Sequence, residues 1–259
     1  MAMKFPSIID GARPNRGLLA VAGAMALALS ACAAPPPPAQ IHDPLEGLNR
    51  GTHALNRGLD RYLLRPASRG YGTILPQPVR TGVSNVAGNL DLPGDMVNGV
   101  LQADPAGTVQ NFFRFVVNTT VGIGGLFDPA TAIGIPHDQT DFGETLHVWG
   151  FGEGPYLEMP GFGPSTVRDG VGIVTDLVMN PMSITLPSPE SDWATAFKLG
   201  SKLGDRDRYS DTIDSILYDS ADSYAQARLL YLQNRRFELG QTGAGSAADD
   251  DGFIDPYEE

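Results

Sequence analysis

The chain has 259 residues, and its 18 basic and 30 acidic side chains give a formal net charge of −12 at pH 7. This acidic balance argues against a nucleic-acid partner, because phosphates require a basic surface, and against electrostatic docking on anionic lipid. The chain is long enough for one sizeable domain.

Residues 1–31 have the features of a secretory signal peptide. Basic side chains precede an apolar run from Gly17 to Ala31, which ends on small residues. The run is shorter than the roughly 20 residues that a transmembrane helix needs. We therefore expect this segment to be removed.

Cys32, the only cysteine of the chain, follows directly. The stretch Leu29-Ser30-Ala31-Cys32 resembles a bacterial lipobox, in which the thiol receives a diacylglycerol and the new amino group is acylated. A lone cysteine has no partner for an intrachain disulfide, and several acyl chains hold a protein firmly on a membrane. We predict lipidation at Cys32, and Ala33 after it favours export to the outer membrane. The alternative is an ordinary signal peptide with an unrelated cysteine.

Both ends of the predicted mature chain are poor in core-forming residues. The tether, residues 32–42, contains Pro35–Pro38, which favour an extended polyproline helix. Residues 241–259 are rich in Gly, Ala and Ser and then acidic, so we predict a disordered tail. Residues 43–240 between them are the predicted helical domain.

The pattern of the domain is helical. Asp43-Pro44-Leu45-Glu46 has the composition of a helix start, and the apolar stripe that follows is predicted to end at Pro66. Further stripes follow Pro78 and Pro93, and Asp-Pro pairs at 104–105 and 128–129 predict two more starts. A last stripe runs through residues 205–237, whereas strand-like alternation is scarce. The fold class is therefore mainly α, with many glycine and proline breaks.

The helix predicted after Asp104 is apolar on nearly every face, except for a narrow stripe of Asn111, Arg114 and Asn118. One interpretation is a buried core helix whose Arg114 is paired with a carboxylate. The other is a helix in apolar surroundings whose polar stripe faces a water-filled lipid path. No mature segment approaches 20 uninterrupted apolar residues, so the second interpretation places the protein in one leaflet.

Sequence signals for catalysis or metal binding are weak. The chain has no G-x-S-x-G elbow, P-loop or H-E-x-x-H motif. Glu144 and His147 have the spacing of a di-iron half-site, but such sites need a second Glu-x-x-His, which the chain lacks. We expect no enzyme, no metal and no cofactor, and we expect solvated loop side chains and a capping Asp in the acidic and histidine-rich stretch His137, Asp138, Asp141, Glu144 and His147.

Five long motifs carry a family resemblance: DPLEGLNR at 43–50, NGVLQADP at 98–105, RFVVNTTVGIGGLFDPA at 114–130, DFGETLHVWGFGEGPYLEMPGFGPSTVRDGVG at 141–172 and SADSYAQARLLYLQNRRF at 220–237. In this order they resemble the MlaA (VacJ) family of bacterial lipoproteins over nearly the whole of residues 43–240. The lipobox agrees with this resemblance.

The resemblance implies a ring of short amphipathic helices embedded in one leaflet, the inner leaflet of the outer membrane, with a central amphipathic channel. It implies that the protein removes mislocalised phospholipids from the outer leaflet for retrograde transport, which maintains lipid asymmetry. The implied partners are porin trimers of the OmpC and OmpF type and a soluble periplasmic lipid carrier of the MlaC type. The alternatives are a structural lipoprotein that braces porin trimers and, as a third class, a lipid-modifying enzyme such as a phospholipase.

Two groups of residues become site candidates under this hypothesis. Asn111, Arg114 and Asn118 are candidates for the lipid path, with Arg114 able to pair with a lipid phosphate. The aromatic side chains of the glycine-rich segment suit the headgroup level of a membrane interface, although packing in an irregular core loop fits them equally. These interface candidates are Trp149, Phe151, Tyr156 and Phe162.

Overall fold

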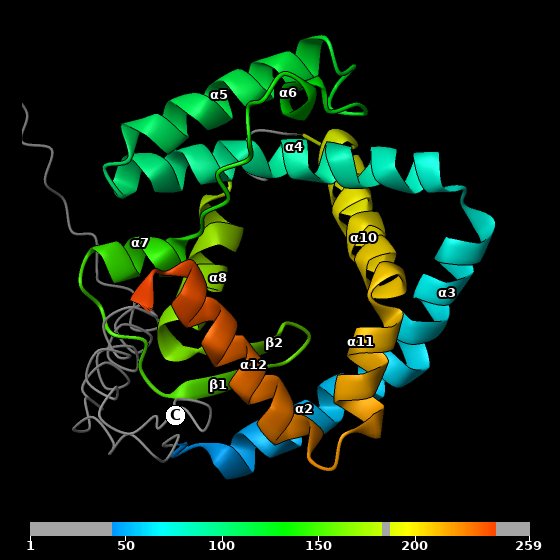
Figure 1. Ribbon diagram of the computed structural model, residues 1–259, viewed down its shortest axis with the longest axis vertical. Helices are drawn as coiled ribbons and strands as arrows, with labels where there is room; N and C mark the ends of the chain where they lie inside the picture. Colours follow the sequence, from blue (N-terminus) through cyan, green and yellow to red (C-terminus); the bar gives the residue numbers. More distant parts are fainter. Residues whose placement is uncertain (1–42, 183–186, 242–259) are drawn as a thin grey trace, which may run out of the picture. The chain divides into compact units, whose positions relative to one another are not determined.

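The computed structural model describes residues 43–182 and 187–241 (Figure 1). Most of these residues are helical, so the mainly α prediction is confirmed, and one short hairpin is the β-structure found among them. The expected signal peptide, Cys32, the proline tether and residues 242–259 of the expected tail lie outside the described ranges.

The first three helical elements are continuous in the chain: α2 (Glu46–Leu59), the π-helical turn η1 (Asp60–Leu64) and α3 (Arg65–Ile74). The prediction that Pro66 ends the first helix is wrong. In the wider π turn the N–H of Arg65 reaches back five residues to the carbonyl of Asp60. Pro66 then stands in the first turn of α3, where its missing N–H and fixed φ are tolerated.

Helix α4 (Gln77–Leu101) continues through Pro93, whereas the sequence pattern predicts separate helices after Pro78 and Pro93. A proline inside a helix costs about 3 kcal/mol, because one backbone hydrogen bond is lost and the ring crowds the preceding turn. The helix persists because it packs against two partners, α5 (Pro105–Thr120) and α10 (Glu190–Arg208), with Leu92 buried.

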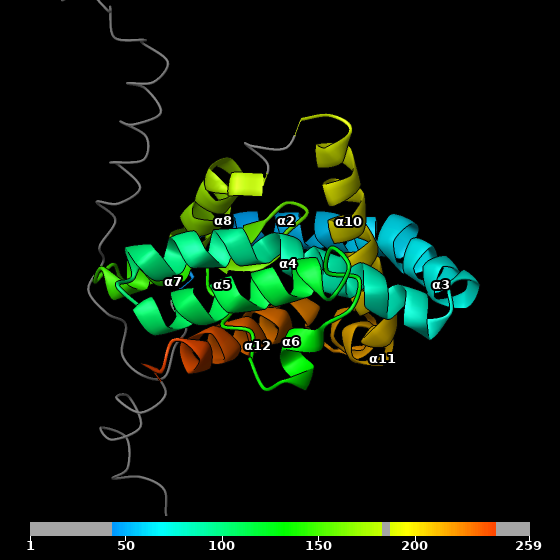
Figure 2. The same ribbon diagram turned by 90° about the horizontal axis from the view of Figure 1, so that it is seen from above.

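The Asp-Pro helix starts at 104–105 and 128–129 are confirmed, whereas α2 begins at Glu46, with Leu45 at its N-cap and no side-chain cap, rather than at Asp43-Pro44. Asp104 accepts hydrogen bonds from the N–H groups of Ala106 and Gly107 in α5, both at 3.1 Å. Asp128 accepts one from the N–H of Thr131 at 3.1 Å and begins the short helix α6 (Pro129–Ala132). Helices α4 and α5 lie side by side along their length (Figure 2).

The glycine- and proline-rich segment contains the hairpin, which the sequence pattern does not reveal. After α7 (Phe142–Val148), strand β1 (Tyr156–Met159) pairs antiparallel with β2 (Gly163–Thr166), and α8 (Val167–Met179) follows at once. Gly161 and Gly163 have φ angles of +76° and +88°, which side chains other than glycine rarely adopt.

The periodic stretch 205–237 is divided in the structure. Helix α10 is followed by α11 (Ser210–Asp214) and a second π turn, η2 (Ser215–Asp219), before the chain becomes extended at Ser220. Asp222 then accepts a hydrogen bond from the N–H of Ala225 at 3.0 Å and begins α12 (Ser223–Glu238).

The described helices and the hairpin form a closed circuit, in which each element packs against the next one around the circuit rather than against the next one in sequence (Figure 1). Helix α3 packs against α10, α10 against α4, and α4 against α7. Helix α7 packs against α8, α8 against the hairpin, and β1 against α2. Within the described residues no helix is both long and apolar enough to cross a membrane.

The side-chain distribution is inverted compared with a water-soluble protein. Among the described residues, six hydrophobic side chains are buried, as against eighteen polar or charged ones. Many large apolar side chains are instead exposed, including Tyr62, Ile74, Val121, Val178 and Phe237. Hydrogen-bonded polar groups therefore hold the interior together, and apolar groups cover much of the outside.

Candidate functional site

The polar stripe of α5 lies on one face, as its spacing predicts, and the structure buries that face. Asn111, Arg114 and Asn118 are 1%, 8% and 4% exposed, respectively. The opposite face carries exposed Val109, Phe112, Phe113 and Val116. Helix α5 therefore has a polar buried side and an apolar exposed side.

Arg114 makes three side-chain hydrogen bonds within the protein. Its Nη2 donates to Oδ2 of Asp128 at 2.6 Å, and its Nη1 donates to the hydroxyl of Thr131 at 2.9 Å and to the carbonyl of Ile135 at 2.6 Å. Burial would raise the pKa of Asp128, but the hydrogen bonds from Thr131 and Asn118 and the charge of Arg114 hold it below its usual value. These contacts match the interpretation of a buried arginine paired with a carboxylate.

The two asparagines fasten the same segment of chain. The side-chain amide of Asn111 donates to the carbonyl of Asp138 at 2.7 Å and accepts from its N–H at 3.2 Å. Asn118 donates to Oδ1 of Asp128 at 3.0 Å and accepts from the N–H of Ala130 at 3.1 Å. The stripe thus fixes residues 128–138 against α5, and a role of these side chains in a lipid path stays a prediction.

Three of the four aromatic candidates reach the surface. Trp149, Phe151 and Phe162 are 50%, 46% and 55% exposed, whereas Tyr156 is 2% exposed and cannot be an interface side chain. Tyr156 is buried because β1 alternates inward and outward, and its ring packs against Tyr224 in the small apolar core. Its hydroxyl donates to Glu158.

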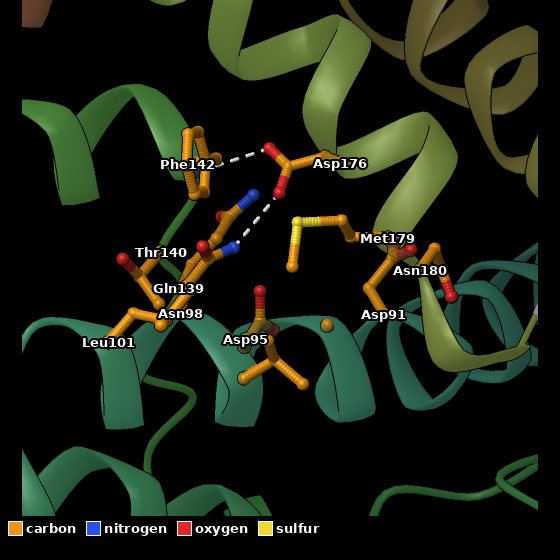
Figure 3. Close-up of a pocket in the computed structure, with 12 residues that line it drawn as sticks. Asp91, Asp95, Asn98, Leu101, Gln139, Thr140, Phe142, Asp176, Met179 and Asn180 are labelled. Atoms are coloured by element: carbon orange, nitrogen blue, oxygen red, sulfur yellow. Dashed lines mark hydrogen bonds between the residues drawn. The ribbon is translucent and has the colours of Figure 1, made fainter. Parts of the chain in front are cut away.

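An amphipathic pocket of about 200 Å³ lies between α4, residues 139–142 and α8 (Figure 3). Asp176 joins its walls, accepting hydrogen bonds from the side chain of Asn98 and from the N–H of Phe142, both at 3.0 Å. The polar lining includes Asp91 and Asp95, and the apolar lining is formed by Val97, Leu101, Phe142 and Met179. A molecule with a polar and an apolar end fits such a lining.

The carboxyl groups of this pocket are partnered. Asp91 forms an ion pair with Lys198 of α10 at 2.5 Å, and Asp95 lies 2.7 Å from Nε2 of His137. Burial raises the pKa of Asp95, which His137 partly offsets, and burial also raises the pKa of Asp176. Both groups therefore take up a proton at a higher pH than an exposed aspartate does.

Sequence reasoning missed this pocket, although a signal is present. Asp91, Asp95 and Asn98 follow one another at steps of four and three residues, which places them on one face of a helix. Pro93 hides this stripe, because it suggests a break in the middle of it. Asp176 comes from a helix 78 residues further along than Asn98, so its place in the pocket has no local signal.

The acidic and histidine-rich residues 137–147 serve different parts of the fold. His137 pairs with Asp95, while Asp141 caps α7 and forms an ion pair with Arg235 at 2.7 Å. His147 lies near Gln241. In residues 43–182 and 187–241 no group of three or more His, Cys, Asp or Glu side chains is arranged to hold a metal ion.

One constellation has the distances of a catalytic triad. His53 places Nε2 3.0 Å from the hydroxyl of Ser223 and Nδ1 3.2 Å from Oε1 of Glu158, with all three side chains buried. An acyl-transfer site also needs free amide donors for the developing oxyanion. Here the carboxylate of Asp222 accepts a hydrogen bond from the N–H of Ala225, two residues after the serine, and the backbone N–H of Tyr224, directly after the serine, also lowers the pKa of this carboxyl. These two amides therefore serve a carboxylate of the protein itself. The arrangement is that of a buried structural network.

Comparison with known proteins identifies the family. A model of the MlaA lipoprotein family matches residues 41–238. The "Intermembrane phospholipid transport system lipoprotein MlaA" of Shigella flexneri is 36% identical over 200 residues, which are 75% of this chain and 77% of that protein, and the protein of the same name from Escherichia coli K12 gives the same figures. The Haemophilus influenzae protein of that name is 32% identical over 222 residues, 83% of this chain and 87% of that protein.

A solved structure reported as "Structural basis for maintenance of bacterial outer membrane lipid asymmetry" superposes with a TM-score of 0.65 at 36% identity. The match covers 76% of this chain and 99% of that one. The resemblance of the five motifs is thus confirmed, both in sequence and in fold. This chain belongs to the MlaA lipoprotein family.

Proposed function

We propose that this protein is a lipid-anchored lipoprotein of the outer membrane that removes mislocalised phospholipids from the outer leaflet. It passes them through an amphipathic path to a periplasmic carrier of the MlaC type, which maintains lipid asymmetry. The names of the curated relatives and the subject of the solved structure support this function. Porin trimers of the OmpC and OmpF type are the membrane partners in this proposal.

The observation that carries the proposal is the inverted side-chain distribution. Each exposed Phe or Leu in water forgoes about 1.5–3 kcal/mol that burial would provide, and contiguous apolar surface marks contact with a membrane or a partner. The exposed apolar side chains lie on several elements of the circuit, such as Leu55 on α2, Phe113 on α5 and Val178 on α8. Immersion in one leaflet accounts for all of them at once.

The polar interior supports the second part of the proposal, the passage of a polar headgroup through the protein. Ionisable groups at membrane depth face one another or a water-filled cavity, because hydrocarbon cannot solvate them. The buried charged groups of the fold, among them Asp60, Asp169 and Arg206, are paired in this way. In the pocket between α4 and α8, polar side chains can contact a headgroup, and Met179 and Leu101 can contact an acyl chain. We therefore propose that this pocket is part of the lipid path.

For Asn111, Arg114 and Asn118 we propose a positioning role beside that path. Each is buried and hydrogen-bonded to residues 128–138, which leaves few donors for a headgroup. The exposed Trp149, Phe151 and Phe162 are proposed as interface side chains at the headgroup level.

A strain that lacks the gene tests the proposal against its alternatives. Lipid transport predicts that phospholipid accumulates in the outer leaflet and that cells become sensitive to detergent, with the wild-type gene restoring both. A porin brace predicts altered porin trimers with normal lipid asymmetry. A phospholipase predicts that the purified protein releases lysophospholipid, and that Ser223→Ala abolishes the release. Either of the last two results, with normal asymmetry in the deletion strain, overturns the transport function.

A paired substitution tests the role of the apolar exterior. Phe112→Asp adds a charge at an exposed apolar position, and Gln226→Asp adds the same charge at an exposed polar position of α12. A carboxylate in hydrocarbon costs about 2.5 kcal/mol or more, so the Phe112 variant should bind phospholipid vesicles more than tenfold more weakly than the Gln226 variant. Equal binding of the two variants would contradict immersion of α5 in lipid.

A further inference from the structure

The amphipathic pocket between α4, residues 139–142 and α8 has acidic side chains and no basic ones among its described lining residues. We propose that it selects phospholipids whose headgroup ends in a primary ammonium, with Asp95 and Asp176 as the carboxylates that face the ammonium. The inference rests on the proposed function, because it assigns a headgroup chemistry to a pocket of the lipid path. The same chemistry would also accept a free primary amine.

The charge of the pocket favours a cation, even after the basic groups next to it are counted. Asp91, Asp95 and Asp176 are the ionisable side chains among its lining residues. Outside the lining, Lys198 pairs with Asp91 at 2.5 Å, and Nε2 of His137 lies 2.7 Å from Asp95. When His137 is counted as charged, three carboxylates stand against two basic groups. At least one negative charge is therefore left over.

Asp176 is the lining carboxylate that forms no ion pair with any residue in the described part of the chain. Its two oxygens accept from neutral donors, an asparagine amide and a backbone N–H, both at 3.0 Å. Burial raises the pKa of Asp176, the charge of Asp141 raises it further, and the charge of Arg235 lowers it. Arg235 is itself paired with Asp141 at 2.7 Å and with Asp169 at 3.3 Å, so it does not supply the missing counter-charge.

The two carboxyl groups point into the same space from opposite walls, Asp95 from α4 and Asp176 from α8 (Figure 3). Asp95 is 6% exposed, so a cation beside it is held away from bulk water, where its attraction to a carboxylate is stronger. Each carboxylate has about four lone-pair sites, of which the two hydrogen bonds to Asp176 use two. The three N–H donors of an ammonium therefore find free acceptors on both walls.

The rest of the lining favours an organic cation over a metal ion. Val97, Leu101, Phe142 and Met179 give the pocket apolar surface beside its carboxylates. Among residues 43–182 and 187–241 no group of three or more His, Cys, Asp or Glu side chains is arranged to hold a metal ion. An ammonium is attached to carbon, so it needs charged acceptors next to apolar contacts, and this pocket provides both.

Direct binding to the full-length protein in nonionic detergent tests the selectivity. The probes are short-chain phosphatidylethanolamine and phosphatidylglycerol with the same acyl chains. Both carry a phosphodiester, so the ratio of their affinities isolates the ammonium, and the wild-type protein should prefer phosphatidylethanolamine about tenfold. Asp176→Asn keeps the size of the side chain without its charge and should abolish most of this preference. Asp219→Asn is the matched control, because Asp219 is exposed and lies outside the lining, and it should change the ratio less than twofold.

A pair of variants at Gln139 keeps the test independent of folding. Gln139 lines the pocket, is exposed, and its side chain makes no hydrogen bond in the described part of the chain. Gln139→Lys should lower the ratio about threefold and Gln139→Glu should raise it about threefold, because the two variants add opposite charges at one position. The same ratio in both variants and the wild-type protein would overturn the ammonium assignment.

Free ethanolamine separates the two sources of an ammonium. Weak binding of ethanolamine, together with a preference for phosphatidylethanolamine that depends on Asp176, supports a headgroup site. Ethanolamine that binds as tightly as phosphatidylethanolamine, with the same dependence on Asp176, overturns the headgroup assignment and leaves a site for free amines. If the wild-type protein binds the two lipids equally, the selectivity is wrong while the transport function stands. Normal asymmetry in the deletion strain would instead remove the transport function and leave Asp176-dependent binding intact.

Discussion

Arg206 of α10 forms a two-pronged ion pair with Asp60 of η1, in which Nε lies 2.7 Å from Oδ1 and Nη2 lies 2.8 Å from Oδ2. Both side chains are buried, and Nη2 also donates to Asp214 at 2.6 Å. The hydroxyl of Tyr218 donates to Asp60 as well. This cluster joins two segments of the circuit that are 146 residues apart in sequence.

Arg206→Ala should destabilise the fold strongly, because it leaves the carboxylate of Asp60 buried without its counter-charge. Breaking one side of a buried ion pair costs about 3–5 kcal/mol. Arg236→Ala is the control, since it breaks an exposed pair with Glu153 and should cost about 1 kcal/mol or less. Denaturant unfolding of both variants in micelles measures the difference, and equal losses would contradict a structural role for the buried cluster.

Arg114→Ala should lower stability by about 2–3 kcal/mol, because Asp128 loses its counter-charge while Ile135 and Thr131 lose a donor. The double variant Arg114→Leu with Asp128→Asn removes both charges and should recover much of the loss. Protein level and lipid asymmetry in cells should recover together if Arg114 is a positioning residue. A stable double variant with defective asymmetry would instead assign Arg114 to the lipid path.

Gly172→Ala should disrupt the crossing of α8 and α7. A Cβ at this position would lie 2.8 Å from the Cα of Gly143 and 3.2 Å from the carbonyl carbon of Phe142, and backbone atoms cannot rotate away. We expect a loss of about 1–3 kcal/mol from this overpacking. Gly88→Ala in α4 has open space around it and should stabilise the helix by up to about 1 kcal/mol. Thermal unfolding compares the two, and an unaffected Gly172 variant would show that the helices can separate freely.

Asp222 should titrate near pH 2 in the folded protein. Its hydrogen bonds with Arg50, and then the amide of Ala225, lower its pKa from 3.8 to about 2. A carboxyl whose pKa is lower in the folded state adds stability above the unfolded value of about 3.8, and this contribution disappears as the pH falls from about 4 to about 2. Arg50→Gln should move the pKa back towards 3.8. Carboxyl NMR titration measures the shift, and an unchanged pKa would exclude Arg50 as its cause.

The parts of the fold that the sequence predicts are those made by neighbours in the chain. Asp104 and Asp128 cap helices through N–H groups two or three residues away, so the Asp-Pro pairs predict α5 and α6 correctly. The prolines mislead where packing outweighs the local preference. Pro93 lies inside α4, and Pro66 is the second residue of α3 after a π turn, because α10 packs against both helices.

The candidate site is likewise predictable from the sequence only where the signal is local. The helical period places Asn111, Arg114 and Asn118 on one face of α5, but it does not say that Asp128 and Asp138 cover that face. The polar stripe on α4 was readable, whereas its partner Asp176 on α8 was not. Tyr156 was predicted as an interface side chain because it lies in a glycine-rich segment, but it is buried. The pairing of β1 with β2 directs its side chain inward, and no local pattern reveals that pairing.

By itself, the sequence determined the family, the helical class and the narrow polar stripe of the otherwise apolar helix after Asp104, because these follow from motif order, period and local composition. Only the tertiary structure decided which side of each helix is buried, and it buried charged groups such as Asp60, Arg114 and Arg206. The physical reason is that ion pairs such as Asp60 with Arg206 form between distant segments, and their energy depends on burial and geometry that no local pattern contains.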